Sequence, residues 1–408
     1  MIALVSAILL APGIVFGGLA AFILVEVLSG FFVRRRLSPR PVGRRPVAVV
    51  VPAHNEAAVI EATLSSLQGQ LQENDRMIVV ADNCIDDTAR IARSLGADVI
   101  ERKDATHKGK GFALQFALDH LKTSVPPETV FFLDADCRLA PGALDLVAGS
   151  SQSADRAAQA LYLMTAPASA NVKCRVSAFA WAFMNQTRMR GLDALAGMTR
   201  VTGAGTAIPW RIAGTLELGA GEIVEDLALS IVLAGQCEGP ILIEEAVVSS
   251  DFPSDGRAAD IQHARWEHGS LRIAFRRAPG LVFRGLASGN RQMAFLGVDI
   301  AAPPLTILFA MLAILLAIGT LLAIVGEVAV AFASAIGLAM LAIAVFAGWL
   351  VDGRRILPLS LAPAVFGYIA SKSGVYGGSA RASTRTWTKT DRDPARGGAS
   401  DEPRPPGQ

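Results

Sequence analysis

The sequence predicts an α/β protein in which a doubly wound, mostly parallel sheet lies between apolar segments at both ends of the chain. Short β-branched runs alternate with helix-like stretches from residue 44 onward, a pattern typical of a sheet with helices on both faces. Hydrophobic residues make up 52% of the 408 residues and concentrate in residues 2–33 and 294–371. That share exceeds the usual content of a soluble domain.

Apolar runs rich in valine and isoleucine mark the buried strands of the central domain. We expect strands over residues 46–52, 77–80, 97–101 and 130–133, and helices over residues 57–71 and 111–121. Ligands bind outside the carboxyl ends of the strands in such sheets. Asp82 follows the second of these strands, and Asp134 and Asp136 follow the fourth. We therefore expect these acids to share one crevice.

Three apolar stretches are long enough to cross a bilayer, which takes roughly 20 helical residues. They cover residues 2–33, 295–325 and 328–351, and two prolines move the expected core of the second to near Leu305. A cleaved signal peptide is the weaker reading of the first stretch, because its basic cluster follows the apolar run instead of preceding it. Arginines after the first and third stretches place the central domain in the cytoplasm by the positive-inside bias. We expect a multi-pass protein of the bacterial inner membrane, in contact with membrane lipid.

The chain divides accordingly into six parts. We expect a transmembrane helix over residues 1–36, a catalytic domain over 44–257 and interfacial helices over 258–293. A transmembrane hairpin over residues 294–352, an interfacial or re-entrant segment over 353–380 and a cytoplasmic tail over 381–408 follow. The formal net charge of +2 offers no basic field for nucleic acid. The four cysteines form no C-x-x-C pair, so free thiols in a reducing compartment are the simplest interpretation.

The triplet Asp134-Ala135-Asp136 predicts a divalent cation site. A nucleotide diphosphate near these carboxylates would be repelled by about 4 kcal/mol per charge pair at roughly 4 Å and an effective dielectric of 20. A bound Mg²⁺ or Mn²⁺ reverses that sign, and carboxylate oxygens suit either ion. The alternative is that both acids only cap a turn. A second such triplet, residues 391–393, lies in the polar tail and receives no function.

Three further residues are candidates for holding a nucleotide and performing the chemistry. Asp82 is placed to accept a hydrogen bond from a base or ribose, or else is an ordinary turn residue. Lys110, favoured over the neighbouring Lys108, lies among glycines that suit phosphate oxygens. Asp226, in Val224-Glu225-Asp226, would take a proton from an acceptor hydroxyl as a general base. Its alternative role is that of a stabilising acid in a first helical turn.

The motif Gln262-His-Ala-Arg265-Trp266 lies in a predicted amphipathic helix over residues 260–277. Spacings of three and four residues put Gln262, Arg265 and Trp266 on one face. Arginine can bind phosphate with two hydrogen bonds and tryptophan can stack on a sugar ring. A buried tryptophan beside an incidental arginine is the alternative. Arginines and phenylalanines over residues 272–284 suit a helix lying on anionic lipid.

Taken together, these residues resemble those of a family, the family 2 glycosyltransferases of the membrane branch that includes cellulose, hyaluronan and chitin synthases. The resemblance covers residues 46–280 and the membrane layout, and it lies in the order of the motifs more than in any one of them. It implies a GT-A fold, a nucleotide-sugar donor that is usually UDP-linked, a divalent metal and inversion at the anomeric carbon. One departure is that Val224 stands where the family has threonine.

The resemblance also implies roles for individual residues. Asp82 would contact the base, Asp134 and Asp136 the metal and phosphates, and Asp226 would be the base. Donor contacts would also come from Lys110 and Arg265, and acceptor contacts from Gly205, Glu225, Gln262 and Trp266. Residues 386–392 are similar to an ending of related membrane transferases and receive no role beyond packing.

We therefore expect an inverting hexosyl- or N-acetylhexosaminyltransferase that acts on a glycan or a polyprenyl-linked acceptor in polysaccharide or glycolipid biosynthesis. Q-x-x-R-W favours processive polymerisation, whereas three membrane helices favour single addition, with an oligomer or a separate translocation partner left open. Two alternatives come from other classes. A nucleotidyltransferase would release pyrophosphate, and a non-catalytic nucleotide-sugar sensor or scaffold would bind donor without turnover.

Overall fold

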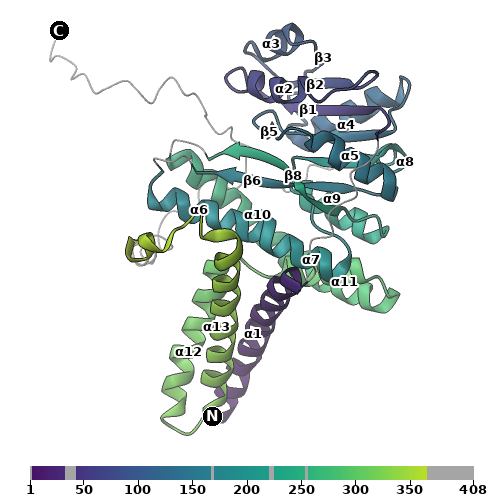
Figure 1. Ribbon diagram of the computed structural model, residues 1–408. Coiled ribbons are helices and arrows are strands. Elements are labelled where there is room, and N and C mark those ends of the chain that lie inside the picture. The colour runs from purple at the N-terminus through teal and green to yellow at the C-terminus, as the bar shows by residue number, and fades with distance from the viewer. Residues whose placement is uncertain (1, 33–42, 167–169, 220–224, 253–255, 365–408) are drawn as a thin grey trace, which may run out of the picture.

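The chain forms a sheet-containing domain that stands on a stalk of apolar helices (Figure 1). The computed structural model describes residues 2–32, 43–166, 170–219, 225–252 and 256–364, and only the backbone of residues 256–270 and 272. A layer of helices separates the sheet from the stalk, and the N-terminus lies at the far end of the stalk (Figure 1).

Eight described strands form one sheet in the order β3-β2-β1-β4-β7-β6-β8-β5. Their bounds are β1 Val47–Ala53, β2 Arg76–Asp82, β3 Asp98–Arg102, β4 Thr129–Phe132, β5 Arg138–Leu139, β6 Ala158–Thr165, β7 Thr206–Pro209 and β8 Ile241–Asp251. The first four are parallel to one another, as the sequence predicts. The other half is mixed, because β7 runs antiparallel to β4 and β6, and β5 antiparallel to β8.

The apolar run of β1 forms the centre of the domain because both of its faces are covered. Val49 and Val51 belong to one buried cluster and Ala48 and Val50 to another, since successive side chains of a strand point to opposite faces. Helices pack on both sides, with bounds α2 Ile60–Gln68, α3 Thr88–Ser94, α4 Lys110–Lys122, α5 Ala143–Ala154, α8 Trp210–Ala213 and α9 Glu225–Gly235. The expected doubly wound α/β arrangement is therefore present.

The layer between sheet and stalk consists of one continuous helical segment, α6-η1-α7, and the helical pair α10 and α11. The bounds are α6 Val172–Ala182, the π-helix η1 Phe183–Thr187, α7 Arg188–Ala196, α10 Gly256–Ser288 and α11 Arg291–Ala301. α10 is longer than the helix expected over residues 260–277, and Pro279 lies inside it. α11 is a separate helix, so the second apolar stretch does not begin at residue 295. Helix α11 ends before Pro303-Pro304, and the next helix begins at Leu305, as the two prolines predict.

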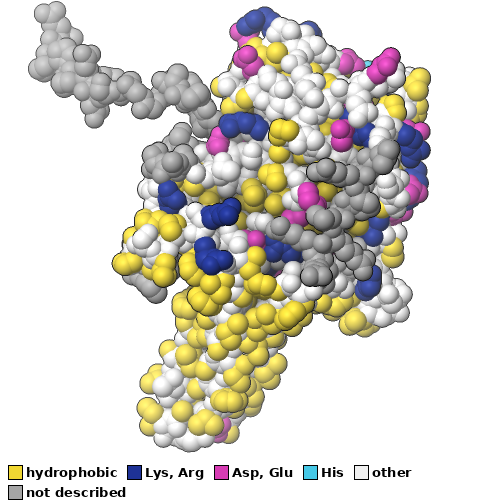
Figure 2. All heavy atoms as spheres, in the orientation of Figure 1, with side chains coloured by type: hydrophobic (Ala, Val, Ile, Leu, Met, Phe, Trp, Pro, Cys, Tyr) yellow, Lys and Arg dark blue, Asp and Glu magenta, His cyan; other side chains and the backbone are white. Residues whose placement is uncertain are grey.

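Three described helices are long and apolar enough to cross a membrane. They are α1 Ile2–Phe32, α12 Leu305–Ala323 and α13 Ala329–Gly348, which continues as the π-helix η2 Trp349–Gly353. Hydrophobic side chains cover the stalk that these helices form, and lysine and arginine side chains gather just above it (Figure 2). Beyond η2, the part of the expected re-entrant segment that the structure describes holds a short 3₁₀ turn, η3 Leu359–Leu361. Residues 365–408 lie outside the described residues.

Candidate active site

The ammonium of Lys110 joins two carboxylates that lie far apart in the sequence. Its Nζ lies 2.6 Å from Asp134 Oδ1 and 3.8 Å from Asp226 Oδ1. Asp134 follows β4, Lys110 is the first residue of α4, and Asp226 lies in the first turn of α9. All three side chains are partly buried. The sequence-predicted phosphate, metal and base residues therefore meet at one point beside the carboxyl end of β4.

The backbone of Gly203 lies against Lys110 and close to Asp226. Its carbonyl accepts a hydrogen bond of 2.9 Å from Lys110 Nζ, and its backbone has φ +88°, a conformation that favours glycine. A Cβ atom there would lie 2.7 Å from Asp226 Oδ2 and 3.0 Å from Lys110 Nζ. Only glycine therefore lets the backbone approach both charged groups.

The local charges shift both titrating groups of the site. Desolvation raises the pKa of Asp226 to about 7, with Lys110 opposing the shift and Glu225 and Asp134 adding to it. Desolvation alone would lower the pKa of Lys110, but Asp134, Asp226 and Glu225 outweigh it and raise that pKa above its usual range. The lysine therefore stays charged, while the Asp226 carboxylate is poised to accept a proton near neutral pH.

Asp134 and Asp136 fit a hard divalent cation. Oxygen atoms of both carboxylates and Sγ of Cys137 lie within 4.8 Å of one another. Cys137 is fully buried, and desolvation raises the pKa of its thiol well above the usual range, so it stays protonated and donates to Asp136 Oδ1 at 3.4 Å. The donor set thus reduces to two carboxylates, which suit Mg²⁺ or Mn²⁺ completed by phosphate and water oxygens.

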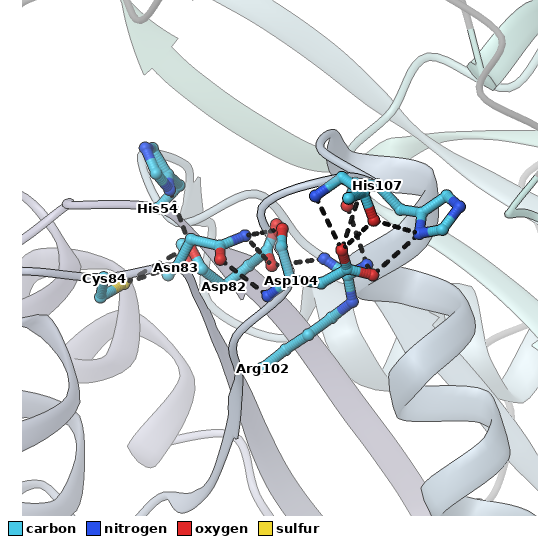
Figure 3. Close-up of polar contacts among 9 residues, drawn as sticks. His54, Asp82, Asn83, Cys84, Arg102, Asp104 and His107 are labelled. Carbon is cyan, nitrogen blue, oxygen red and sulfur yellow. Dashed lines mark hydrogen bonds and ion pairs between the residues drawn. The ribbon is translucent and has the colours of Figure 1, made fainter.

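Asp82 lies at the same edge of the sheet, two strands away from Asp134. It is the last residue of β2, and β1 separates β2 from β4, which corresponds to about 10 Å between strand axes. Its Oδ1 accepts hydrogen bonds from Arg102 Nη1 at 2.8 Å and Asn83 Nδ2 at 2.9 Å. The other terminal nitrogen of Arg102, Nη2, lies 3.0 Å from Asp104 Oδ2 (Figure 3). Arg102 and Asp104 thereby fix the orientation of the Asp82 carboxylate.

The other predicted residues are placed less directly. Gly205 is buried within the sheet, where its N–H donates to Phe132 O and a Cβ would meet Val248. Gly203 of the same loop, and not Gly205, faces Asp226. Glu225 begins α9 next to Asp226, and Lys108 is exposed. Gln262, Arg265 and Trp266 lie on α10, but their side chains are outside the described residues.

Sequence reasoning missed the residues that support this site. The Ser230 hydroxyl donates to Asp226 O and accepts from Val201 N–H. Gln159 is fully buried and bonds to both the 202 amide and the 204 carbonyl. The only available signal for Ser230 is its position one helical turn after Asp226, and Gln159 carries no signal beyond being polar inside an apolar run.

Known proteins match this part of the chain. Residues 48–162, which carry Asp82, Lys110, Asp134 and Asp136, match the family model described as glycosyl transferase family 2. The chain is 35% identical over 95 residues to a 4,4'-diaponeurosporenoate glycosyltransferase of Staphylococcus aureus. This match covers 22% of the chain and 24% of that protein, so the chain spans about a quarter of the length of the curated relatives it matches.

A solved structure matches over a greater length. It is a mannosyltransferase from Pyrobaculum calidifontis, in complex with GDP-Man and Mn²⁺, with a TM-score of 0.52 and 19% identity. The match covers 85% of this chain and 97% of that one, and it shows a common fold. Glucosyl-3-phosphoglycerate synthase from Mycobacterium tuberculosis matches with a TM-score of 0.39, 20% identity, and 58% and 82% coverage. Residues 48–162 therefore match glycosyl transferase family 2, in a domain with the GT-A fold that is joined to helices apolar enough to span a membrane.

Proposed function

We propose that this protein transfers a sugar from a nucleoside-diphosphate sugar to a glycan or lipid-linked acceptor, with inversion at the anomeric carbon. The observation that supports the proposal most strongly is the convergence of Lys110, Asp134 and Asp226. A cation for phosphate, a carboxylate for metal and a base of raised pKa are the groups that such a transfer needs. A UDP-linked donor is the expectation from the resemblance.

These positions support the following reaction. The acceptor oxygen attacks the anomeric carbon, the bond from that carbon to the phosphate oxygen breaks, and its electron pair leaves with the nucleoside diphosphate. Asp226 takes the acceptor's proton. Lys110 neutralises phosphate charge, and Mg²⁺ or Mn²⁺ bound by Asp134 and Asp136 would stabilise the leaving diphosphate. Asp82 would position the base, and Arg265, Gln262 and Trp266 on α10 would complete the donor and acceptor contacts.

The membrane helices suggest where the reaction takes place. Arg354 and Arg355 follow η2 at the end of the stalk nearest the sheet, and both are exposed. Because basic residues favour the cytoplasmic side, we place the sheet domain in the cytoplasm beneath the inner membrane. An acceptor attached to a polyprenyl carrier or to a growing glycan would then meet the site at the lipid surface. The product would be a polysaccharide or a glycolipid.

The test is a donor screen on the purified full-length protein in lipid nanodiscs, with Mn²⁺ or Mg²⁺ and extracted lipid and glycan acceptors. We expect release of UDP or GDP from one sugar nucleotide, abolished by a chelator, with sugar incorporated in equal amount. Release of pyrophosphate instead would identify a nucleotidyltransferase. Donor binding without turnover under every condition would favour a sensor or scaffold and contradict the proposal. Product length on a sizing gel would separate processive from single addition.

A further inference from the structure

Four charged side chains form a buried group at the junction of the stalk and the sheet domain. Arg188 Nε lies 2.7 Å from Glu26 Oε2, and its Nη2 lies 2.6 Å from Asp299 Oδ1. Arg200 Nε lies 3.3 Å from the other oxygen of Asp299. We call Glu26, Arg188, Asp299 and Arg200 the anchor cluster. Glu26 and Arg188 have side-chain exposures of 0% and 1%.

The anchor cluster joins elements that belong to different parts of the molecule. Glu26 is the only charged residue of the apolar helix α1, Arg188 begins α7, and Asp299 lies in the last turn of α11, just before α12. α1 and α7 touch directly, because a Cβ on Gly191 would overlap the carbonyl of Glu26. One arginine of the helical layer thus binds both Glu26 of the first apolar helix and Asp299 just before the second.

Stability alone gives a weak reason for such a group. Removing charges from water is costly, and buried ion pairs are often no more stable than apolar residues of the same size. Glu26 Oε1 also accepts no hydrogen bond from the described residues, which adds to that cost. A role that buried ion pairs do serve is to fix one element in a single register against another.

The element that the cluster fixes leads directly to the candidate active site. Arg200 belongs to the segment 197–205 between α7 and β7, and its Nη2 also donates to Met184 O at 2.9 Å. The next residue, Val201, donates its N–H to Ser230 Oγ at 2.9 Å, and that hydroxyl donates to Asp226 O at 2.8 Å. Two residues further on, Gly203 accepts the hydrogen bond from Lys110. Only residues 201 and 202 therefore separate Arg200 of the cluster from Gly203, whose carbonyl accepts from Lys110 and whose Cα faces Asp226.

We propose that the anchor cluster positions segment 197–205, so that Asp226 and Lys110 are held in reacting geometry only when α1 and α11 are docked. Arg188 and Arg200 are positioning residues in this account and touch no substrate. The inference rests on the proposed transferase function for its kinetic consequence. It also has a structural consequence, the rigidity of segment 197–205, that is measurable without turnover.

The test compares two charge-balanced double variants of the full-length protein in nanodiscs. Glu26→Gln with Arg188→Met removes one acid and one base and leaves Asp299 paired with Arg200. The matched control is Arg44→Met with Asp75→Asn. That pair is equally buried, with side-chain exposures of 1% and 0% and a distance of 2.7 Å. It lies just before β1 and β2, at the amino-terminal ends of these strands, whereas the candidate active site lies at the carboxyl ends. Both pairs also leave a second acid behind, Asp299 or Asp145.

We expect the Glu26/Arg188 variant to lose roughly tenfold to a hundredfold in kcat, the size expected from a misplacement of about 1 Å. Donor Kd should stay within about twofold, because no donor contact is removed. We expect the melting temperature of the control to fall by a similar amount and its kcat to stay unchanged. If kcat falls in both variants, and in each only by the amount that the loss of folded protein explains, the cluster has a purely structural role and the inference is wrong.

Hydrogen exchange gives the second measurement and separates this inference from the proposed function. The amides of Val201 and Gly205 are bonded to Ser230 Oγ and Phe132 O, so they should be protected in the wild type. We expect faster exchange at both amides in the Glu26/Arg188 variant and no change in the control. Unchanged exchange in both variants overturns the inference, even if the wild type is an active transferase. Faster exchange would support it even if no donor is turned over.

Discussion

The ammonium of Lys110 lies between carboxylates that come from two different elements, the segment after β4 and the start of α9. Lys110→Met should remove this bridge and leave the charges of Asp134 and Asp226 to repel phosphate. We expect donor Kd to rise at least tenfold, the loss of one charge-assisted contact. Lys122→Met is the matched control, because Lys122 ends the same helix and pairs only with Asp119 among the described residues. Titration calorimetry with nucleotide and Mn²⁺ measures both, and equal affinities would contradict the role of Lys110.

The raised pKa of Asp226 gives a prediction for pH dependence. A base must be deprotonated to act, and desolvation puts the pKa of Asp226 at about 7. We therefore expect kcat/KM, which reports the free enzyme, to rise tenfold per pH unit up to about pH 7 and then level off. An ordinary aspartate would give a plateau down to about pH 4. A flat profile between pH 5 and 8 would remove Asp226 from the role of base.

At this scale the sequence predicted the residues with a strong chemical signature and missed their supports. Asp134, Asp226 and Lys110 meet as the motifs indicate. Arg102, which holds Asp82, was not predicted, because an arginine at the end of a strand has no distinctive pattern. Such partners become visible only when the register of β2 and β3 places residues 82 and 102 side by side.

The loop before β7 is the element whose geometry most constrains the site. Gly203 and Gly96 both have positive φ, +88° and +81°, but only Gly203 approaches other atoms. Alanine at either position should cost about 1–2 kcal/mol of stability for the left-handed backbone. We expect Gly203→Ala also to reduce kcat at least tenfold, because its Cβ would meet Asp226 Oδ2 at 2.7 Å. A kinetic comparison at equal folded fraction tests this, and equal kcat in both variants would contradict it.

Among the elements, the apolar parallel strands and the long helices were predictable, and the second half of the sheet was not. The strand β1 was predictable because its run of valines is apolar at successive positions, which is typical of a strand buried on both faces. β6, β7 and β8 pair across separations of 40 residues or more, and no local pattern encodes such pairing. The two prolines at residues 303 and 304 did predict where α12 begins.

At the scale of the whole molecule, the orientation of the stalk determines which compartment supplies the donor. The turn between α12 and α13, which holds Glu327, lies at the end of the stalk away from the sheet (Figure 1), whereas Cys237 is exposed in the sheet domain. We expect a membrane-impermeant maleimide to label Glu327→Cys in intact cells and to label Cys237 only after permeabilisation. The opposite labelling order would place the sheet domain outside and contradict a cytoplasmic donor site.

We propose Asp226, beside Lys110 and Asp134, as the base of a sugar transfer. The most direct measurement is the single-turnover rate of sugar transfer by Asp226→Asn, alongside its donor Kd, with Asp119→Asn on the exposed end of α4 as control. We predict at least a thousandfold loss of rate, of the order found when a catalytic base is removed, with donor Kd unchanged within about threefold and a fully active control. Transfer at the wild-type rate by Asp226→Asn would contradict the account.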